Sequence, residues 1–398
     1  MKNNKVVLAF SGGLDTSYCA KYLSNDLNLE VHSAIINTGG FSEDELIEIE
    51  SKALKLGVKS HVCLEKTAVY YEKIIRYLIF GNILKNNTYP LSVSAERIFQ
   101  AIAIAEYAKE IGASAIAHGS TGAGNDQVRF DLIFQLVCPT IQIITPIRDL
   151  KLSRNEEIAY LKSYGVEFNW KKASYSINKG LWGTSIGGKE TLTSHLELPE
   201  EAYPHSLENI DQEIIELTFE KGEIKAIDGV ALSPIEAIQL IENRANSFAI
   251  GRDMHVGDTI IGIKGRIAFE AAAPLILIKA HHLLEKHTLT KWQLHWKEQL
   301  ANWYGMFLHE AQYFEPVMRN IESFLSASQE TVSGKVHVKL LPYRFELIGI
   351  ESQHDLMNST FGEYGEMNNA WSSDDVKGFT KISLNATLIH HTVNNLIS

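Results

Sequence analysis

One stretch near the amino end constrains the fold more than any other, because a buried strand runs directly into a glycine turn. Five apolar residues, Val6–Phe10, precede Ser11-Gly12-Gly13, and a helical pattern begins at Thr16. A continuous apolar run is typical of a strand covered on both faces. Two glycines permit close approaches that a side chain would block, and the free amides of the next helix suit a phosphate. We therefore expect a strand–turn–helix phosphate site.

Asp15 needs a separate explanation, because a carboxylate next to a polyphosphate repels it. A divalent cation between the two removes that repulsion, so we expect Asp15 to contact Mg²⁺. The stretch lacks the lysine of a Walker A loop and the G-x-G-x-x-G spacing of a dinucleotide fold. Its Ser-Gly-Gly-x-Asp pattern resembles the pyrophosphate loop of the ATP pyrophosphatase superfamily, whose members cleave ATP between the α and β phosphates.

Strand and helix patterns alternate over about the first 165 residues. We expect strands at 6–10, 29–36, 60–64, 114–117 and 141–144, and helices at 16–27, 43–56, 67–80, 95–111 and 126–137. This alternation indicates an α/β fold with a parallel sheet, in which ligands lie beyond the carboxyl ends of the strands. The segment Asn37–Phe41 follows one such end, and we interpret it either as a turn or as a contact with adenine or ribose.

A second glycine-rich loop, His118 to Phe130, follows the expected strand at 114–117. It ends with Asn125, Asp126 and Arg129, which supply an amide, a carboxylate and a guanidinium within five residues. Arginine binds a carboxylate through two parallel hydrogen bonds, and aspartate accepts from an amino group. The loop therefore predicts a site for an amino-acid zwitterion, whereas His118 itself is expected to be structural. Ser92 or Ser94, further upstream, could simply cap the helix that follows.

The alternation stops at Phe168, so we place a domain boundary near 165–170. We expect a nucleotide-binding domain over 1–167, an α+β synthetase domain for substrate binding and oligomerisation over 168–380, and a helical tail over 381–398. In the second domain the patterns predict hairpins at 213–227 and 335–350, a helix from 234 to 243, and a helical region at 290–326 broken near Glu315-Pro316. A short helix is expected at 385–397.

The composition is that of an ordinary globular chain, with 398 residues, 45% hydrophobic and 21% charged. A net charge of −11 argues against nucleic-acid or acidic-membrane partners. Cys19, Cys63 and Cys138 have no metal-ligand spacing, and we expect three buried, reduced thiols. Without a signal peptide or an apolar run of about 20 residues, the protein is expected to be cytoplasmic.

Two long motifs identify a closer resemblance. Ala9–Ser17 together with His118–Phe130 resembles argininosuccinate synthase, and shorter family motifs follow in order at Tyr175-Ser176, Leu181–Ser185, Ile261–Arg266, Lys279–His282 and Val332–Val336. The resemblance covers nearly the whole chain. It implies a homotetrameric ligase of arginine biosynthesis that joins citrulline to L-aspartate through a citrullyl-adenylate, with ATP and Mg²⁺. Such chemistry requires positioning and charge stabilisation rather than a covalent nucleophile.

The resemblance also implies roles for individual residues. The residues expected to bind ATP are Ala9, Phe10, Ser11, Gly12, Gly13, Leu14, Asp15, Thr16, Ser17, Ile36 and Gly119. Those expected to bind citrulline are Tyr89, Ser94, Asn125, Arg129, Ser176 and Ser185, and those for aspartate are Thr121, Asn125 and Asp126. We expect Asp15, Asp126 and Arg129 to contribute most to catalysis.

Several positions depart from the family pattern. Ala123 replaces a lysine, Asn178-Lys179-Gly180 replaces an Asp-x-Asn segment, and Gly257 and Phe269 replace a glutamate and a tyrosine near the citrulline head group. One interpretation is drift, with Asp258 standing in for the lost glutamate. The other is that the substrate is N-acetylcitrulline or N-succinylcitrulline, since acylation removes the ammonium and Lys179 could pair with a dicarboxylic acyl chain.

Other function classes fit less well. A tRNA thiolase would need paired cysteines and a basic surface, and a glutamine-fed amidotransferase would need a nucleophilic cysteine domain. A nucleotide-binding sensor without catalysis would not need the group of amino-acid-binding side chains between Thr121 and Arg129.

Overall fold

The structure is a computed structural model that describes residues 4–166, 175–358, 362, 364–366 and 370–396. The chain forms two compact units, Met1–Gln353 and His354–Ser398. The expected boundary at 165–170 falls largely on residues outside the described ranges. The division into domains at 167 and 380 therefore stays a prediction.

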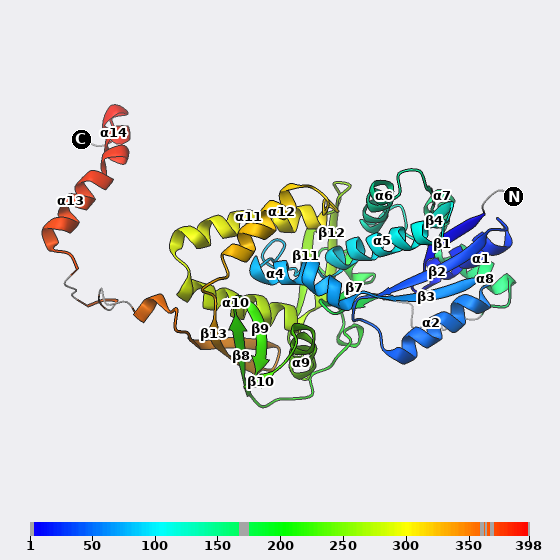
Figure 1. Cartoon of the computed structure of the whole chain (residues 1–398), viewed down its shortest axis with the longest axis horizontal. Helices are drawn as coiled ribbons and strands as arrows, with labels where there is room; N and C mark the ends of the chain where they lie inside the picture. The colour runs from blue at the N-terminus through cyan, green and yellow to red at the C-terminus, as the bar shows by residue number, and fades with distance from the viewer. Residues whose placement is uncertain (1–3, 167–174, 359–361, 363, 367–369, 397–398) are drawn as a thin grey trace. The chain divides into compact units, whose positions relative to one another are not determined.

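A five-stranded parallel sheet forms the amino-terminal part of the first unit (Figure 1). Its order is β3-β2-β1-β4-β5, from β1 (Lys5–Ala9), β2 (Glu30–Asn37), β3 (Ser60–Glu65), β4 (Ala115–Ala117) and β5 (Gln142–Ile144). Every pairing is parallel. This confirms the expected α/β fold, and each predicted strand lies within three residues of its observed position.

Helices cover both faces of this sheet, because successive side chains of a strand point to opposite sides. Val7 and Ala9 pack with α5 (Ser92–Glu110) and α6 (Asp126–Val137). Val6 and Leu8 pack against the opposite helices, which are α1 (Leu14–Asn25), α2 (Glu43–Lys55), α7 (Pro146–Asp149) and α8 (Arg154–Ser163). The helix α8 was not expected from the sequence.

The helix expected at 67–80 is interrupted. It consists of α3 (Thr67–Tyr70), a π-helical turn (Tyr71–Ile75) and α4 (Arg76–Phe80). Tyr70, Tyr71, Ile74 and Ile75 are all buried around the wider turn. Periodicity in the sequence indicated a helix here but did not indicate the change in its winding.

The rest of the first unit contains two more sheets. An antiparallel sheet of order β10-β9-β8-β13-β14 comprises β8 (Glu213–Glu220), β9 (Glu223–Ile227), β10 (Val230–Ala231), β13 (Gly334–Leu341) and β14 (Arg344–Glu351). Both expected hairpins are present in it. An unexpected sheet of order β11-β12-β7-β6 comprises β6 (Ser176–Gly180), β7 (Gly183–Gly187), β11 (Arg252–Asp258) and β12 (Lys264–Glu270).

Four helices complete this part: α9 (Pro234–Asn246), α10 (Ala272–Thr288), α11 (Lys291–His309) and α12 (Val317–Ala327). The break in the expected region 290–326 is therefore at 310–316, just before and at Pro316. One apolar core runs from α5 through α10 and α11 to β8 and β13, so both halves of the first unit share it.

The second unit contains a short 3₁₀ turn (Leu356–Asn358), α13 (Ser373–Ser383) and α14 (Asn385–Val393). The helix expected at 385–397 is thus present, whereas α13 was not expected. Among the described residues, no helix combines the length and apolarity that crossing a membrane requires.

One expectation about the cysteines is wrong. Cys19 and Cys138 are buried free thiols, but Cys63 is exposed. Cys63 lies on β3, which is an edge strand of the parallel sheet. Neighbouring elements therefore do not cover its side chain as the sequence suggested.

Candidate functional site

A cleft of about 1050 Å³ opens at the carboxyl ends of β1, β2 and β4. Most of the residues predicted for the site line it: Ala9, Phe10, Ser11, Gly13, Leu14, Asp15, Thr16, Ile36, Tyr89, Ser94, Gly119, Thr121, Asn125, Asp126, Arg129 and Ser176. Gly40 and Phe41, from the segment after β2, line it as well. The two glycine-rich loops therefore share one cavity with residues from β6, β11 and α11.

The segment Phe10–Ser17, here called the phosphate loop, takes its shape mainly from its backbone. Gly12 has φ +76°, a conformation that other residues rarely adopt. Gly13 precedes α1 as its N-cap and provides no side chain to cap the helix. The first amides of α1 are therefore available to an anion, and the helix dipole favours negative charge there. Ser17 is buried, and its hydroxyl donates to the Gly13 carbonyl at 2.6 Å.

The second loop packs closely on the first. A Cβ added at Gly119 would lie 3.1 Å from the carbonyl carbon of Asp15 and 3.2 Å from the amide nitrogen of Thr16. His118 holds this loop, since it contacts Asp131 through Nε2 at 2.9 Å and accepts from the Ser120 amide through Nδ1. This arrangement fits the structural role expected for His118.

Two residues support the phosphate loop from behind, and neither was noticed in the sequence. Lys52 of α2 donates to the Gly12 carbonyl, and burial lowers the pKa of Lys52 to about 8. Glu157 of α8 is buried, and burial together with the nearby Asp15 carboxylate raises the pKa of Glu157 to about 8. Both helices are distant in sequence from the motif, so no local pattern pointed to them.

A buried group of charged and polar residues forms the other side of the cleft. We call Ser94, Arg97, Asp126, Arg129 and His309 the arginine corner. Asp126 accepts from Arg97 Nε at 3.1 Å and from an Arg129 terminal nitrogen at 2.9 Å. Burial raises the pKa of Asp126, but the two guanidinium groups outweigh that effect and hold the pKa below its usual range. One carboxylate thus fixes two cations.

Arg129 is held from several sides. Besides Asp126, it donates to Ser94 Oγ at 3.0 Å and to the His309 carbonyl oxygen at 3.1 Å. The expectation that Ser92 or Ser94 caps α5 is wrong, because the N-cap is Leu91 and no side chain bonds there. The Ser94 hydroxyl instead bridges Arg129 and the imidazole of His309.

Further contacts come from the second half of the unit. Asn178 of β6 accepts from Arg97 at 2.6 Å, and Asn125 accepts from the Ile260 amide at 2.8 Å. Ser185 does not line the cleft; it is buried and contacts the Tyr89 hydroxyl at 2.9 Å. Ser185 therefore holds the Tyr89 hydroxyl, and its predicted contact with citrulline stays a prediction.

The positions that depart from the family pattern have definite surroundings. A Cβ at Gly257 would lie 2.7 Å from Nε2 of His255, so the glycine makes room for that ring. His255 stacks on Tyr89 with a centroid separation of 5.2 Å, and the buried Phe269 packs on the same tyrosine. Asp258 is exposed and forms an ion pair with Lys264 at 2.6 Å.

Two family models match the two halves of the chain. Residues 5–167 match the arginosuccinate synthase N-terminal HUP domain, and residues 175–389 match the arginosuccinate synthase C-terminal domain. The chain is 37% identical to the argininosuccinate synthase of Methanocaldococcus jannaschii over 90% of this chain and 91% of the relative. It is 36% identical to that of Dictyoglomus thermophilum over 96% of each, and 33% identical to that of Xylella fastidiosa over 100% of each. The chain therefore belongs to the argininosuccinate synthase family.

Proposed function

We propose that this protein uses ATP to join citrulline and L-aspartate, forming argininosuccinate, AMP and pyrophosphate. One observation carries the proposal beyond family membership. The phosphate loop and the arginine corner line a single cleft, so a nucleotide on the loop places its α-phosphate beside an amino acid at the corner.

The chemistry follows from the substrates. The ureido oxygen of citrulline is a poor leaving group, so it first attacks the α-phosphorus and expels pyrophosphate. The aspartate amine then attacks the ureido carbon, and AMP leaves. The amides of α1 face the phosphates and Lys52 holds the Gly12 carbonyl behind them, while Arg97 and Arg129 stabilise charge on the amino-acid side. Fixing the reactants in line lowers the activation barrier of such a reaction by about 7–11 kcal/mol.

A Mg²⁺ ion fits the carboxyl groups of Asp15 and Glu157 at the phosphate loop. Asp15 lines the cleft, and the buried Glu157 beside it has an Oε2 atom without a hydrogen-bond partner. In the described part of the chain, no group of three or more His, Cys, Asp or Glu could hold a metal. The ion would therefore take most of its ligands from phosphate oxygens and water, as Mg²⁺ commonly does, and neutralise phosphate charge there.

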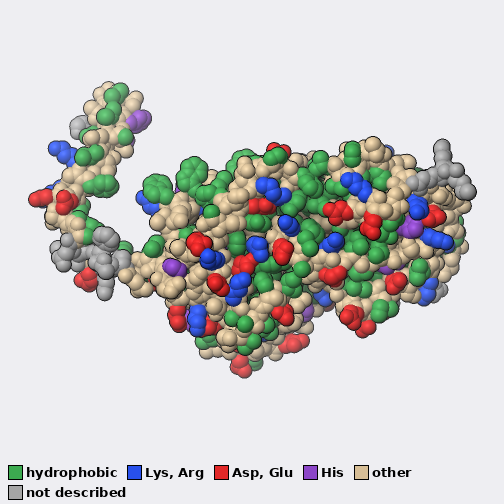
Figure 2. Space-filling view, in the orientation of Figure 1, with side chains coloured by type: hydrophobic (Ala, Val, Ile, Leu, Met, Phe, Trp, Pro, Cys, Tyr) green, Lys and Arg blue, Asp and Glu red, His purple; other side chains and the backbone are tan. Residues whose placement is uncertain are grey.

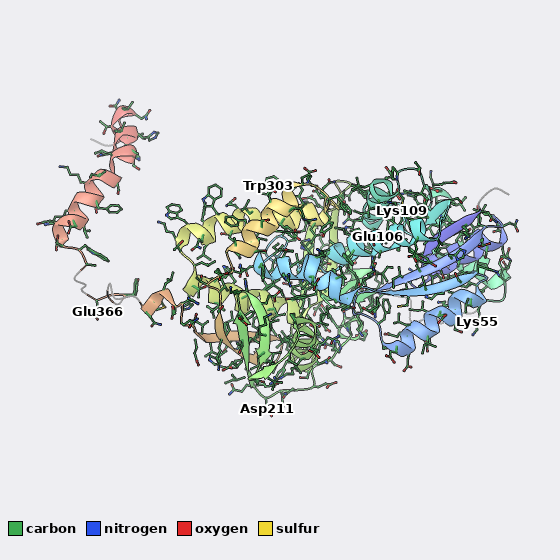
Figure 3. All side chains as sticks on the ribbon, viewed as in Figure 1. Lys55, Glu106, Lys109, Asp211, Trp303 and Glu366 are labelled. Carbon is green, nitrogen blue, oxygen red and sulfur yellow. The ribbon has the colours of Figure 1, made fainter. Side chains whose placement is uncertain are left out.

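We also infer a homotetramer, located in the cytoplasm where ATP is supplied. Exposed apolar side chains on α11 support self-association: Trp292, Trp296, Trp303 and Met306 are 65%, 61%, 55% and 44% exposed. Figure 2 shows apolar side chains gathered over this helix, and Trp303 projects from it in Figure 3. Light scattering should give four chains, and Trp292→Ser with Trp296→Ser should reduce that number.

The decisive experiment follows the ureido oxygen. With citrulline labelled with ¹⁸O at the ureido group, we expect multiple-turnover pyrophosphate release that requires ATP, citrulline and aspartate together, and ¹⁸O in the AMP. A protein that binds ATP but releases no pyrophosphate with both amino acids present would be a sensor, and the proposal would be wrong.

A second candidate substrate is citrulline acylated with an acetyl or succinyl group. Asp126 and Asp258, which line the amino-acid side of the cleft, are both ion-paired, whereas Lys179 lines the same cleft and its side chain is exposed. Comparing kcat/KM for citrulline, N-acetylcitrulline and N-succinylcitrulline decides between them. A clear preference for free citrulline excludes the acylated substrates.

A further inference from the structure

His309 is a buried histidine at the end of α11 that also lines the cleft. Only 7% of it is exposed, and its ring lies against Ser94, 215 residues earlier in the chain. The sequence gives no indication of this proximity, because α11 follows the parallel-sheet region by more than a hundred residues.

The neighbours of the ring determine which nitrogen carries the proton. Arg129 donates to Ser94 Oγ at 3.0 Å, which leaves the Ser94 hydroxyl proton directed at Nδ1 of His309, 3.1 Å away. A terminal nitrogen of Arg129, which can only donate, also lies 3.3 Å from Nδ1 of His309. Nδ1 is therefore the acceptor, and Nε2 carries the hydrogen.

The environment of the His309 ring keeps it neutral at neutral pH. Burial, followed by the positive charges of Arg129 and Lys85, lowers the pKa of His309 to about 3. The Asp258 backbone carbonyl and the His255 ring also face it, the first raising the pKa and the second lowering it. Nε2 is buried. The Asp258 carbonyl lies nearby but outside normal hydrogen-bond geometry, so within the described residues Nε2 has no well-formed hydrogen bond.

We propose that the Nε2–H of His309 donates a hydrogen bond to a carboxylate oxygen of the citrulline substrate, which His309 and Arg129 bind together. A buried polar group without a partner is costly, and a ligand atom that completes its bonding removes that cost. A committed N–H donor beside a guanidinium attracts a carboxylate and repels an ammonium. This assignment rests on the proposed function and adds a substrate-binding residue to it.

The matched variants His309→Asn and His309→Gln test the assignment in steady-state pyrophosphate release. The glutamine amide nitrogen reaches the position of Nε2, whereas the asparagine amide does not. We expect His309→Asn to raise KM for citrulline about 10- to 100-fold, and His309→Gln to raise it less. KM for ATP and aspartate should change less than about threefold. His195→Gln, at an exposed histidine outside the cleft, should match the wild type.

A substrate analogue makes the test independent of variant folding. Citrullinamide has a neutral amide in place of the carboxylate, and wild-type kcat/KM should fall about 10- to 100-fold with it. Equal use of citrullinamide and citrulline by the wild type would overturn the proposal. So would a His309→Asn variant that melts at a lower temperature but keeps its KM for citrulline, since His309 would then serve only packing. A wild type that releases no pyrophosphate with citrulline contradicts the proposed function instead.

Discussion

The phosphate loop and the arginine corner lie in one cleft but are built differently. The loop is a single stretch of eight residues whose shape comes from glycine backbone and a helix start, and Ser11 and Gly13 in it are exposed. The corner joins α5 and α6 to α11, which lies far along the chain from both, through side chains that are mostly buried.

This difference predicts how the two regions respond to mutation. Between the buried Phe10 and Ser17, the loop carries few interactions for the fold, so its polar side chains Ser11, Asp15 and Thr16 should affect mainly activity. A corner whose charges compensate each other inside the protein should affect both activity and stability.

The largest effect is expected for Asp15→Ala. Loss of the carboxylate should lower the rate of pyrophosphate release about 1000-fold. Without Asp15, the Mg²⁺ ion that it would hold no longer offsets the charge on the leaving phosphates. The melting temperature should stay close to that of the wild type, since Asp15 is partly exposed. The exposed Asp44→Asn on α2 is the control. Turnover within tenfold of the wild type would show that Asp15 has no part in the reaction.

Asp126→Asn should affect both properties. The neutral amide leaves Arg97 and Arg129 without their shared counter-charge, so we expect about a 100-fold loss of kcat/KM and about 2 kcal/mol of stability. Activity assays and urea unfolding measure the two effects separately. If stability is unchanged while activity falls, the corner behaves like the loop, and the contrast between them is lost.

A pH effect should distinguish the corner next. His309 has its ordinary pKa of about 6.5 when unfolded and about 3 when folded, so between these values only the unfolded chain takes up a proton. As far as His309 is concerned, the free energy of unfolding is therefore highest above pH 6.5. It falls by about 1.4 kcal/mol for each pH unit below that value.

Urea unfolding of the wild type and of His309→Gln at several pH values between 6.5 and 4.5 isolates the effect of His309 on the free energy of unfolding. The variant should show the shallower pH dependence, and the exposed His195→Gln should follow the wild type. Parallel curves for the wild type and His309→Gln would mean that the ring takes up a proton in the folded protein as readily as in the unfolded chain.

The smallest effect is expected for Lys52→Met at the phosphate loop. Below pH 8 the charged ammonium orients the Gly12 carbonyl, and above it the charge is lost, because burial lowers the pKa of Lys52 to about 8. We expect KM for ATP to rise about three- to tenfold in the variant. The wild-type KM for ATP should rise above pH 8, while that of the variant should not. A variant with the wild-type pH profile would assign the change to another group.

The same contrast explains what could be predicted from the sequence. The phosphate loop, α6 and the individual strands of the parallel sheet depend on neighbouring residues, so apolar runs and glycine spacing indicated where they lie, whereas the strand order depends on distant pairings. The β6–β7–β12–β11 sheet, the Ser185–Tyr89 contact and the place of His309 depend on long-range packing, which leaves no periodic signal. Cys63 was misjudged for a related reason, since its exposure depends on β3 being an edge strand.

The shared apolar core has a consequence for how the molecule comes apart. Because α5 packs against the parallel sheet on one side and contacts α11 on the other, removing either half uncovers apolar surface of the remaining one. The first unit should therefore melt in a single calorimetric transition. Separately expressed halves should recover ligase activity only when they are refolded together, as fragments of one folding unit rather than as two modules.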